Sequence, residues 1–148
     1  MILTNAMVLL TTSSQDISGL VSRVRLNRTF DEHDDTRFGL TDHSRVPGLG
    51  SWSFDLEAIQ TFESTGSTFY STGLATSLDA ILAAKVGSAA FQVEVRPVNA
   101  ARSSDNPGYQ GSVRLFEYSP IDGGAGDLLK TPIKLLSAGS LVRAVTSS

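Results

Sequence analysis

The fold of this chain is decided by two alternating runs, Ile17–Phe30 (ISGLVSRVRLNRTF) and Ser51–Phe62 (SWSFDLEAIQTF). Apolar and polar residues alternate in each run, as they do in a β-strand with one buried face and one wet face. The predicted apolar faces are Leu20, Val24, Leu26 and Phe30 in the first run and Trp52, Phe54, Leu56, Ala58 and Phe62 in the second. Because consecutive strands usually lie side by side, we expect the two runs to pair as a hairpin.

The polar faces of the predicted hairpin carry charges of both signs. Pairing would bring Arg23 and Arg25 close to the carboxylates of the second run on one wet surface. The polar faces are Arg23, Arg25, Asn27 and Thr29 in the first run and Ser51, Ser53, Asp55, Glu57 and Thr61 in the second. Asp55 and Glu57 resemble a catalytic carboxylate pair, but two neighbouring arginines favour ion-paired surface residues over a general acid and base.

The composition limits the classes of protein to which this chain can belong. The 148 residues suffice for one domain with a core, and 41% apolar with 18% charged residues is typical of a globular protein. The formal charge of −3 argues against a protein that binds nucleic acid by neutralising phosphates. The absence of cysteine excludes disulfides and thiolate chemistry. We expect neither a secretory signal nor a membrane span, since no stretch approaches the roughly 20 apolar residues that a span needs.

The link between the two runs, Asp31–Gly50, is predicted to be a long charged loop. Its charged residues are Asp31, Glu32, Asp34, Asp35, Arg37, Asp42 and Arg45, and Gly39, Pro47, Gly48 and Gly50 interrupt it. Loops of this length are usually functional or disordered, and mixed charges can bind a complementary partner. The acidic residues lack calcium-loop spacing, and His33 and His43 have no third nitrogen ligand, so no metal site is predicted.

The rest of the chain predicts one helix and several further strands. Leu74, Leu78, Ile81 and Leu82 share one helical face within Gly73–Val86, with a weak capping box at Thr76 and Asp79 and a stop at Gly87. The further predicted strands are Ala89–Pro97, Gln110–Ser119, Leu128–Leu136 and Leu141–Val145. Pro132 favours an edge or the start of its strand. Residues Met1–Asp16 are either an edge strand with a turn or an arm that reaches a neighbouring subunit.

These elements predict a mainly β fold, a β-sandwich or split barrel with one flanking helix, in a single domain over residues 1–148. Nothing in the sequence indicates catalysis or a cofactor. No serine lies in a G-x-S-x-G motif, and Gly123–Gly126 neither precedes Lys-Ser or Lys-Thr nor opens a helix. We therefore expect no enzyme activity and no cofactor.

From Asp16 onward the chain resembles the major tail tube proteins of long-tailed bacteriophages. The resemblance depends on the order and spacing of several short motifs, none of them catalytic. In the second half these are Val95-Arg96-Pro97, Asn106-Pro107-Gly108-Tyr109, Tyr118-Ser119-Pro120, Gly123–Asp127 and Ala138–Ala144. In the first half they are Asp16-Ile17-Ser18-Gly19, Asp34–Gly39 and Ser51–Asp55.

The resemblance implies hexameric rings stacked into a hollow tube within a virion tail, made in the bacterial cytoplasm. Tape measure, tail terminator and baseplate proteins would be partners, and DNA would pass through the tube without specific binding. The hairpin would line the lumen and its loop, with the termini, would contact the next ring. The implied lumen-facing residues are Arg23, Arg25, Asn27, Ser53, Asp55 and Glu57, and the implied stacking residues are Asp31, Glu32, Asp34, Asp35, Arg37, Asp42 and Arg45.

Other functions fit the same pattern. A tail terminator, a baseplate tube initiator or a secretion-system tube protein would share the fold, and fold does not determine function. A β-sandwich that binds carbohydrate would need exposed aromatic residues, yet Trp52 lies on the predicted apolar face. The polar face of the hairpin could also be the outside of a monomeric sandwich, because the alternation does not say which way that face points.

Overall fold

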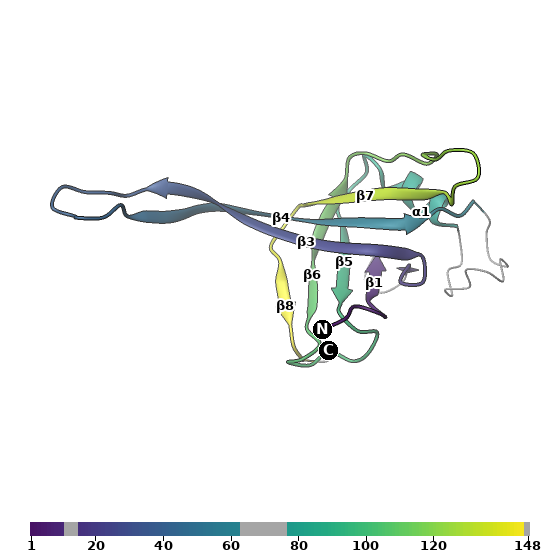
Figure 1. Ribbon diagram of the computed structural model, residues 1–148, viewed down its shortest axis with the longest axis horizontal. Helices are drawn as coiled ribbons and strands as arrows, with labels where there is room; N and C mark the ends of the chain where they lie inside the picture. Colours follow the sequence, from purple (N-terminus) through teal and green to yellow (C-terminus); the bar gives the residue numbers. More distant parts are fainter. Residues whose placement is uncertain (11–14, 63–76, 147–148) are drawn as a thin grey trace.

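A long hairpin dominates the computed structural model, which describes residues 1–10, 15–62 and 77–146. It consists of β3 (Val21–Asp34) and β4 (Arg45–Ile59), and its outer half projects away from the body of the molecule (Figure 1). Arg23 lies opposite Glu57, and Arg25 lies opposite Asp55. The predicted hairpin and the grouping of these four charges are therefore confirmed.

The prediction of a long loop over Asp31–Gly50 is wrong for half of that segment. β3 continues to Asp34 and β4 begins at Arg45, so only residues 35–44 connect the strands. The glycines that suggested a loop are covered from across the hairpin: the Phe30 ring lies over Gly50 and the His33 ring over Gly48. Cross-strand aromatic packing compensates for a glycine in a strand, and so the ladder continues.

All strands belong to one antiparallel sheet with the order β2-β1-β5-β6-β7-β4-β3, and β8 pairs with β6. The remaining strands are β1 (Met7–Leu10), β2 (Gln15–Asp16), β5 (Phe91–Arg96), β6 (Gly108–Leu115), β7 (Lys130–Ser137) and β8 (Val142–Ala144). β3, β4 and β7 run across the direction of β1, β5 and β6 (Figure 1), and the core is shared by both groups of strands. The mainly β prediction is confirmed, with one folded sheet providing both layers.

Buried and half-buried side chains alternate along the inner part of β4. Trp52, Phe54, Leu56 and Ala58 are buried, whereas the residues between them are half-buried. Trp52 packs over Gly111 of β6, where an added Cβ would lie 2.6 Å from the indole ring, and its Nε1 donates to the carbonyl oxygen of Gly139 at 2.8 Å.

The ends of the two hairpin runs differ from the prediction. β3 begins at Val21, because Ile17 and Leu20 form a hydrogen-bonded turn that buries both side chains. β4 ends at Ile59, and Phe62 beyond it is 53% exposed. Phe30 is also exposed, and it belongs to the part of β3, residues 27–34, in which every residue is exposed.

Helix α1 (Leu78–Lys85), the one helix among the described residues, is shorter than predicted but packs as expected. Leu78, Ile81 and Leu82 are buried against the core, and Gly87 follows the helix with φ +68°, a left-handed conformation that suits glycine. Ser77 caps the helix by accepting a hydrogen bond from the Ala80 amide. The predicted start at Gly73 and the capping residue Thr76 lie outside the described residues.

At the amino terminus, β1 is inserted between β2 and β5, and Val8 and Leu10 belong to the core. Residues 7–10 thus form a strand inside the sheet, and the edge position that was predicted for this segment is taken by β2. Met1, Ile2 and Leu3 precede the sheet and are largely exposed.

Candidate assembly surfaces

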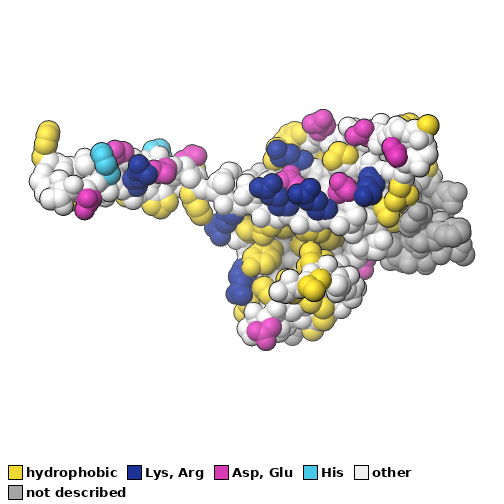
Figure 2. All heavy atoms as spheres, in the orientation of Figure 1, with side chains coloured by type: hydrophobic (Ala, Val, Ile, Leu, Met, Phe, Trp, Pro, Cys, Tyr) yellow, Lys and Arg dark blue, Asp and Glu magenta, His cyan; other side chains and the backbone are white. Residues whose placement is uncertain are grey.

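The first candidate surface is the polar face, which we define as the outward side of β3, β4 and β7. It brings together all six residues that the sequence placed there and adds two lysines from β7. Its members are Arg23, Arg25, Asn27, Ser53, Asp55, Glu57, Lys130 and Lys134. Figure 2 shows these strands carrying a row of basic side chains with acidic ones among them. Four cations against two carboxylates make this face locally positive, although the whole chain has a charge of −3.

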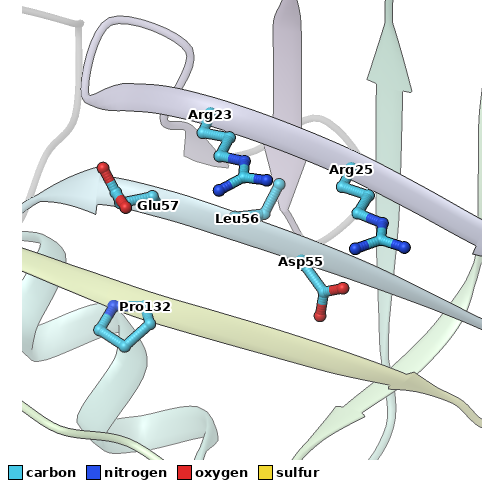
Figure 3. A pocket seen from close by; sticks show the side chains of 6 residues that line it. All are labelled: Arg23, Arg25, Asp55, Leu56, Glu57 and Pro132. Atoms are coloured by element: carbon cyan, nitrogen blue, oxygen red, sulfur yellow. The ribbon is translucent and has the colours of Figure 1, made fainter.

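A shallow hollow of about 230 Å³ lies within the polar face. It is lined by Arg23, Arg25, Asp55, Leu56, Glu57 and Pro132. Figure 3 shows the two arginines on β3, the two carboxylates on the adjacent β4, and Pro132 beyond them on β7. No residue lining the hollow is a nucleophile with an adjacent base, so the arrangement offers charge and hydrogen bonding but no recognisable chemistry of catalysis.

Ion pairing on the polar face differs from the prediction. Glu57 pairs with Lys130 at 3.2 Å and accepts a hydrogen bond from Ser22, and these contacts, with the charge of Arg23, lower the pKa of its carboxyl group. Within the part of the chain that the structure describes, neither Arg23 nor Arg25 forms an ion pair. Their guanidinium groups therefore remain available to solvent or to a partner.

Sequence reasoning missed the contribution of β7, although its pattern contained the signal. Lys130, Pro132 and Lys134 are exposed and alternate with the buried Thr131 and Ile133. β7 pairs with β4 along this part, whereas β6 reaches β7 only at residues 135–137. Pro132 therefore lies in the half of β7 that has only β4 as a neighbouring strand. This position suits a residue that has no backbone N–H to donate.

The second candidate surface is the distal hairpin, which we define as residues 30–50. It holds all seven residues that the resemblance assigned to ring stacking. Asp31, Glu32 and Asp34 belong to β3, Asp35, Arg37 and Asp42 to the connection, and Arg45 to β4. Five carboxylates and two arginines give the segment a formal charge of −3. This equals the charge of the entire chain, so the rest of the molecule has no net charge.

Much of the charge in the distal hairpin is paired internally. Arg37 pairs with Asp35 at 3.1 Å and Arg45 with Glu32 at 2.8 Å. Asp34 accepts hydrogen bonds from the amide and hydroxyl of Thr36, and both lower the pKa of its carboxyl group.

Exposed apolar side chains are the feature of the distal hairpin that sequence reasoning missed. Phe30, Phe38, Leu40, Val46 and Leu49 are all exposed, Phe38 completely and Leu49 to 84%. They account for five of the fifteen large apolar side chains that are exposed among the described residues. Scattered apolar residues on a surface are normal, but a concentration on one projecting segment marks an interaction site.

Two partly buried polar clusters hold the body together beside these surfaces. Glu94 accepts from Arg102 at 2.7 and 2.8 Å and from Arg96 at 2.6 Å, and these contacts lower the pKa of its carboxyl group to about 2. Tyr118 donates to Asp79 at 2.6 Å, and burial raises the pKa of its hydroxyl group to about 12. Both clusters join loops to the sheet or the helix and are interpreted as structural.

The described ranges contain no group of three histidine, aspartate or glutamate residues that could hold a metal ion. None of the helical structure described is both long and apolar enough to cross a membrane.

Solved structures share this fold over almost the entire chain. A chain in the virion of a native gene transfer agent particle aligns with a TM-score of 0.66 and 14% identity, covering 95% of both chains. A chain in the tail of an empty gene transfer agent particle with C6 symmetry gives 0.60 and 14%, covering 95% and 94%. A chain in the extended sheath-tube complex of the extracellular contractile injection system PVC gives 0.58 and 12%, covering 96% and 89%. No protein-family model and no curated protein sequence matches the chain.

Proposed function

We propose that this protein is a tail tube subunit, a structural protein that assembles into hexameric rings stacked as a hollow tube. The main support is the fold, which it shares over 95% of its length with chains of tail particles, one of them with C6 symmetry. The tube would belong to a virion tail and conduct DNA. Tape measure, terminator and baseplate proteins would be its partners.

In this proposal the polar face lines the lumen. DNA must slide along the wall, and a purely basic stripe would retain it through counterion release. Asp55 and Glu57 interrupt the cations, and Lys130 offsets Glu57 directly. The wall is thus weakly positive and screened by salt, which favours passage over tight binding.

Ring closure would use the open edge of the sheet. β3 is the last strand in the sheet order, so one of its edges has no partner within the described chain. An exposed strand edge pairs readily with another chain, and a rotation that closes produces a ring. We propose that the edge of β3 pairs with a neighbouring subunit in the ring.

The alternative is a terminator, a baseplate tube protein or a secretion-type tube. A chain of a sheath/tube terminator and a chain of the anti-feeding prophage baseplate share the fold as well. Self-polymerisation separates the two. A tube subunit extends without limit when concentrated, whereas a terminator stops at one ring. Electron microscopy of the purified protein therefore tests the proposed function, and a protein that stays monomeric at every concentration would contradict it.

A further inference from the structure

We infer that the apolar side chains of the distal hairpin, with Phe38 as the anchor, carry the contact between stacked copies of this chain, and that its charged side chains do not. The inference rests on the proposed function and deepens it. The resemblance assigned stacking to seven charged residues, and the structure supports a different set.

The first observation is that both arginines of the distal hairpin already have partners. Arg37 lies 3.1 Å from Asp35, and Arg45 lies 2.8 Å from Glu32. Forming ion pairs with a second copy would break these internal pairs, so little would be gained. Solvent-exposed ion pairs contribute weakly in any case, because water and salt screen them.

The second observation is that several apolar side chains of the distal hairpin have little cover within the described fold. Phe38 is completely exposed and Leu40 is 53% exposed, both in the connection between β3 and β4. Leu49 adds a third on β4 at 84% exposure. An aromatic side chain buries a large apolar area when a complex forms and its site is desolvated, and Phe38 can supply such an anchor.

The third observation identifies the occupant as a second copy. The distal hairpin projects from one end of the body (Figure 1), and residues 31–49 do not pack on the core of their own chain. A projecting segment that docks on a different surface of an identical chain makes a head-to-tail contact, and such contacts repeat into a filament. The remaining charge of the segment, −3, would meet a body that is balanced overall and would not be repelled by it.

The test compares Phe38→Ser with Arg37→Gln. The second variant removes the ion pair with Asp35 at the adjacent residue, which is also exposed. Tube and ring fractions are measured by sedimentation and negative-stain electron microscopy at low salt and at about 1 M NaCl. We expect Phe38→Ser to form rings but to weaken stacking by about tenfold or more, as loss of a binding hot spot does. Arg37→Gln and wild type should form tubes at both salt concentrations.

Other outcomes separate the inference from the proposed function. The inference would be overturned if Phe38→Ser formed tubes as long as those of wild type. It would also be overturned if tubes shortened at high salt and in Arg37→Gln. In both cases the proposed tube function would stand. Wild-type protein that makes neither rings nor tubes would overturn both. Circular dichroism of each variant serves as the folding control, since residue 38 lies outside the core.

Discussion

At the scale of single residues, the partly buried ion cluster around Glu94 connects the loop after β5 to the sheet. The Glu94 side chain is 11% exposed and that of Arg102 12%, and Arg102 contacts Glu94 with two nitrogens and Gln110 with one. Asn106 completes the loop by donating to three carbonyl oxygens and accepting from the Val98 amide. Removing one charged partner from such a network leaves the other charges uncompensated and lowers the stability of the folded state.

Glu94→Gln is expected to destabilise the fold by about 2–4 kcal/mol, because it leaves two arginines without a carboxylate. The pH dependence follows from the pKa of about 2, below the ordinary 4.5. A depressed pKa stabilises the folded state above pH 4.5, and this stabilisation is lost as the pH falls towards 2. Urea denaturation at pH 7 and pH 3 measures both effects. A variant that loses as much stability from pH 7 to pH 3 as wild type would contradict this role of Glu94.

Gly111 is a second residue whose role can be tested. A Cβ at this position would lie 2.6 and 2.7 Å from the Trp52 ring and 2.9 Å from the carbonyl oxygen of Ser140. Gly111→Ala is therefore expected to displace the indole and to cost about 1–3 kcal/mol by overpacking. Chemical denaturation monitored by the fluorescence of this single tryptophan measures the loss. Gly139→Ala, where a Cβ would meet Ser112 at an ordinary 3.6 Å, is the matched control, and equal losses would contradict the packing argument.

At the scale of elements, the sequence predicted the parts where one local pattern dominates. Period-two alternation placed the hairpin and the four strands that follow α1 to within a few residues, and helical spacing of buried residues placed α1 itself. It failed in the distal hairpin, where turn-forming residues suggested a loop. Gly48 and Gly50 are held in the strand by His33 and Phe30 from across the ladder, and such cross-strand packing is invisible until the register is known.

The same limitation applied to the candidate surfaces. Arg23, Arg25, Asp55 and Glu57 could be grouped because the two runs are adjacent in sequence. Lys130 could not, since it joins the polar face through the pairing of β7 with β4, some seventy residues away in the chain. The apolar character of the distal hairpin was hidden because its charged residues are more numerous.

Removal of the distal hairpin should separate folding from assembly. Residues 31–49 contribute nothing to the hydrophobic core of the described chain. Replacing them by Asn-Gly, which favours a two-residue hairpin turn, is expected to change the free energy of unfolding by less than about 1 kcal/mol while abolishing tubes. Thermal unfolding and electron microscopy give the two results. Persistence of tubes in this variant would contradict the stacking role.

The open edge of β3 can be tested with a pair of proline variants. Adjacent residues in a strand direct their N–H groups to opposite edges of that strand. One of the two variants Arg23→Pro and Val24→Pro therefore removes an N–H that bonds to β4, and the other removes an N–H that faces the open edge. We expect the variant that retains its thermal stability to lose the ability to form rings. Normal rings from that variant would argue against strand pairing between subunits.

At the scale of the whole molecule, the orientation of the polar face is the feature that connects the structure to the proposed conduction of DNA. The chain has no cysteine, so a single Asn27→Cys or Ser53→Cys substitution introduces a unique thiol on that face. In assembled tubes we expect this thiol to react with a small maleimide but not with a maleimide coupled to a large polymer. A thiol at the exposed Asp105 is the control, and equal reaction of both sites with the polymer would place the polar face outside the tube.

Assembly is the central claim, and negative-stain electron microscopy of the untagged, concentrated protein tests it most directly. The fold shared with chains of tail particles, the open edge of β3 and the uncovered apolar side chains of the distal hairpin all lead to the same expectation. We predict long hollow tubes built from stacked rings. Only small monomers at every concentration, from protein that is fully folded by circular dichroism, would contradict the account.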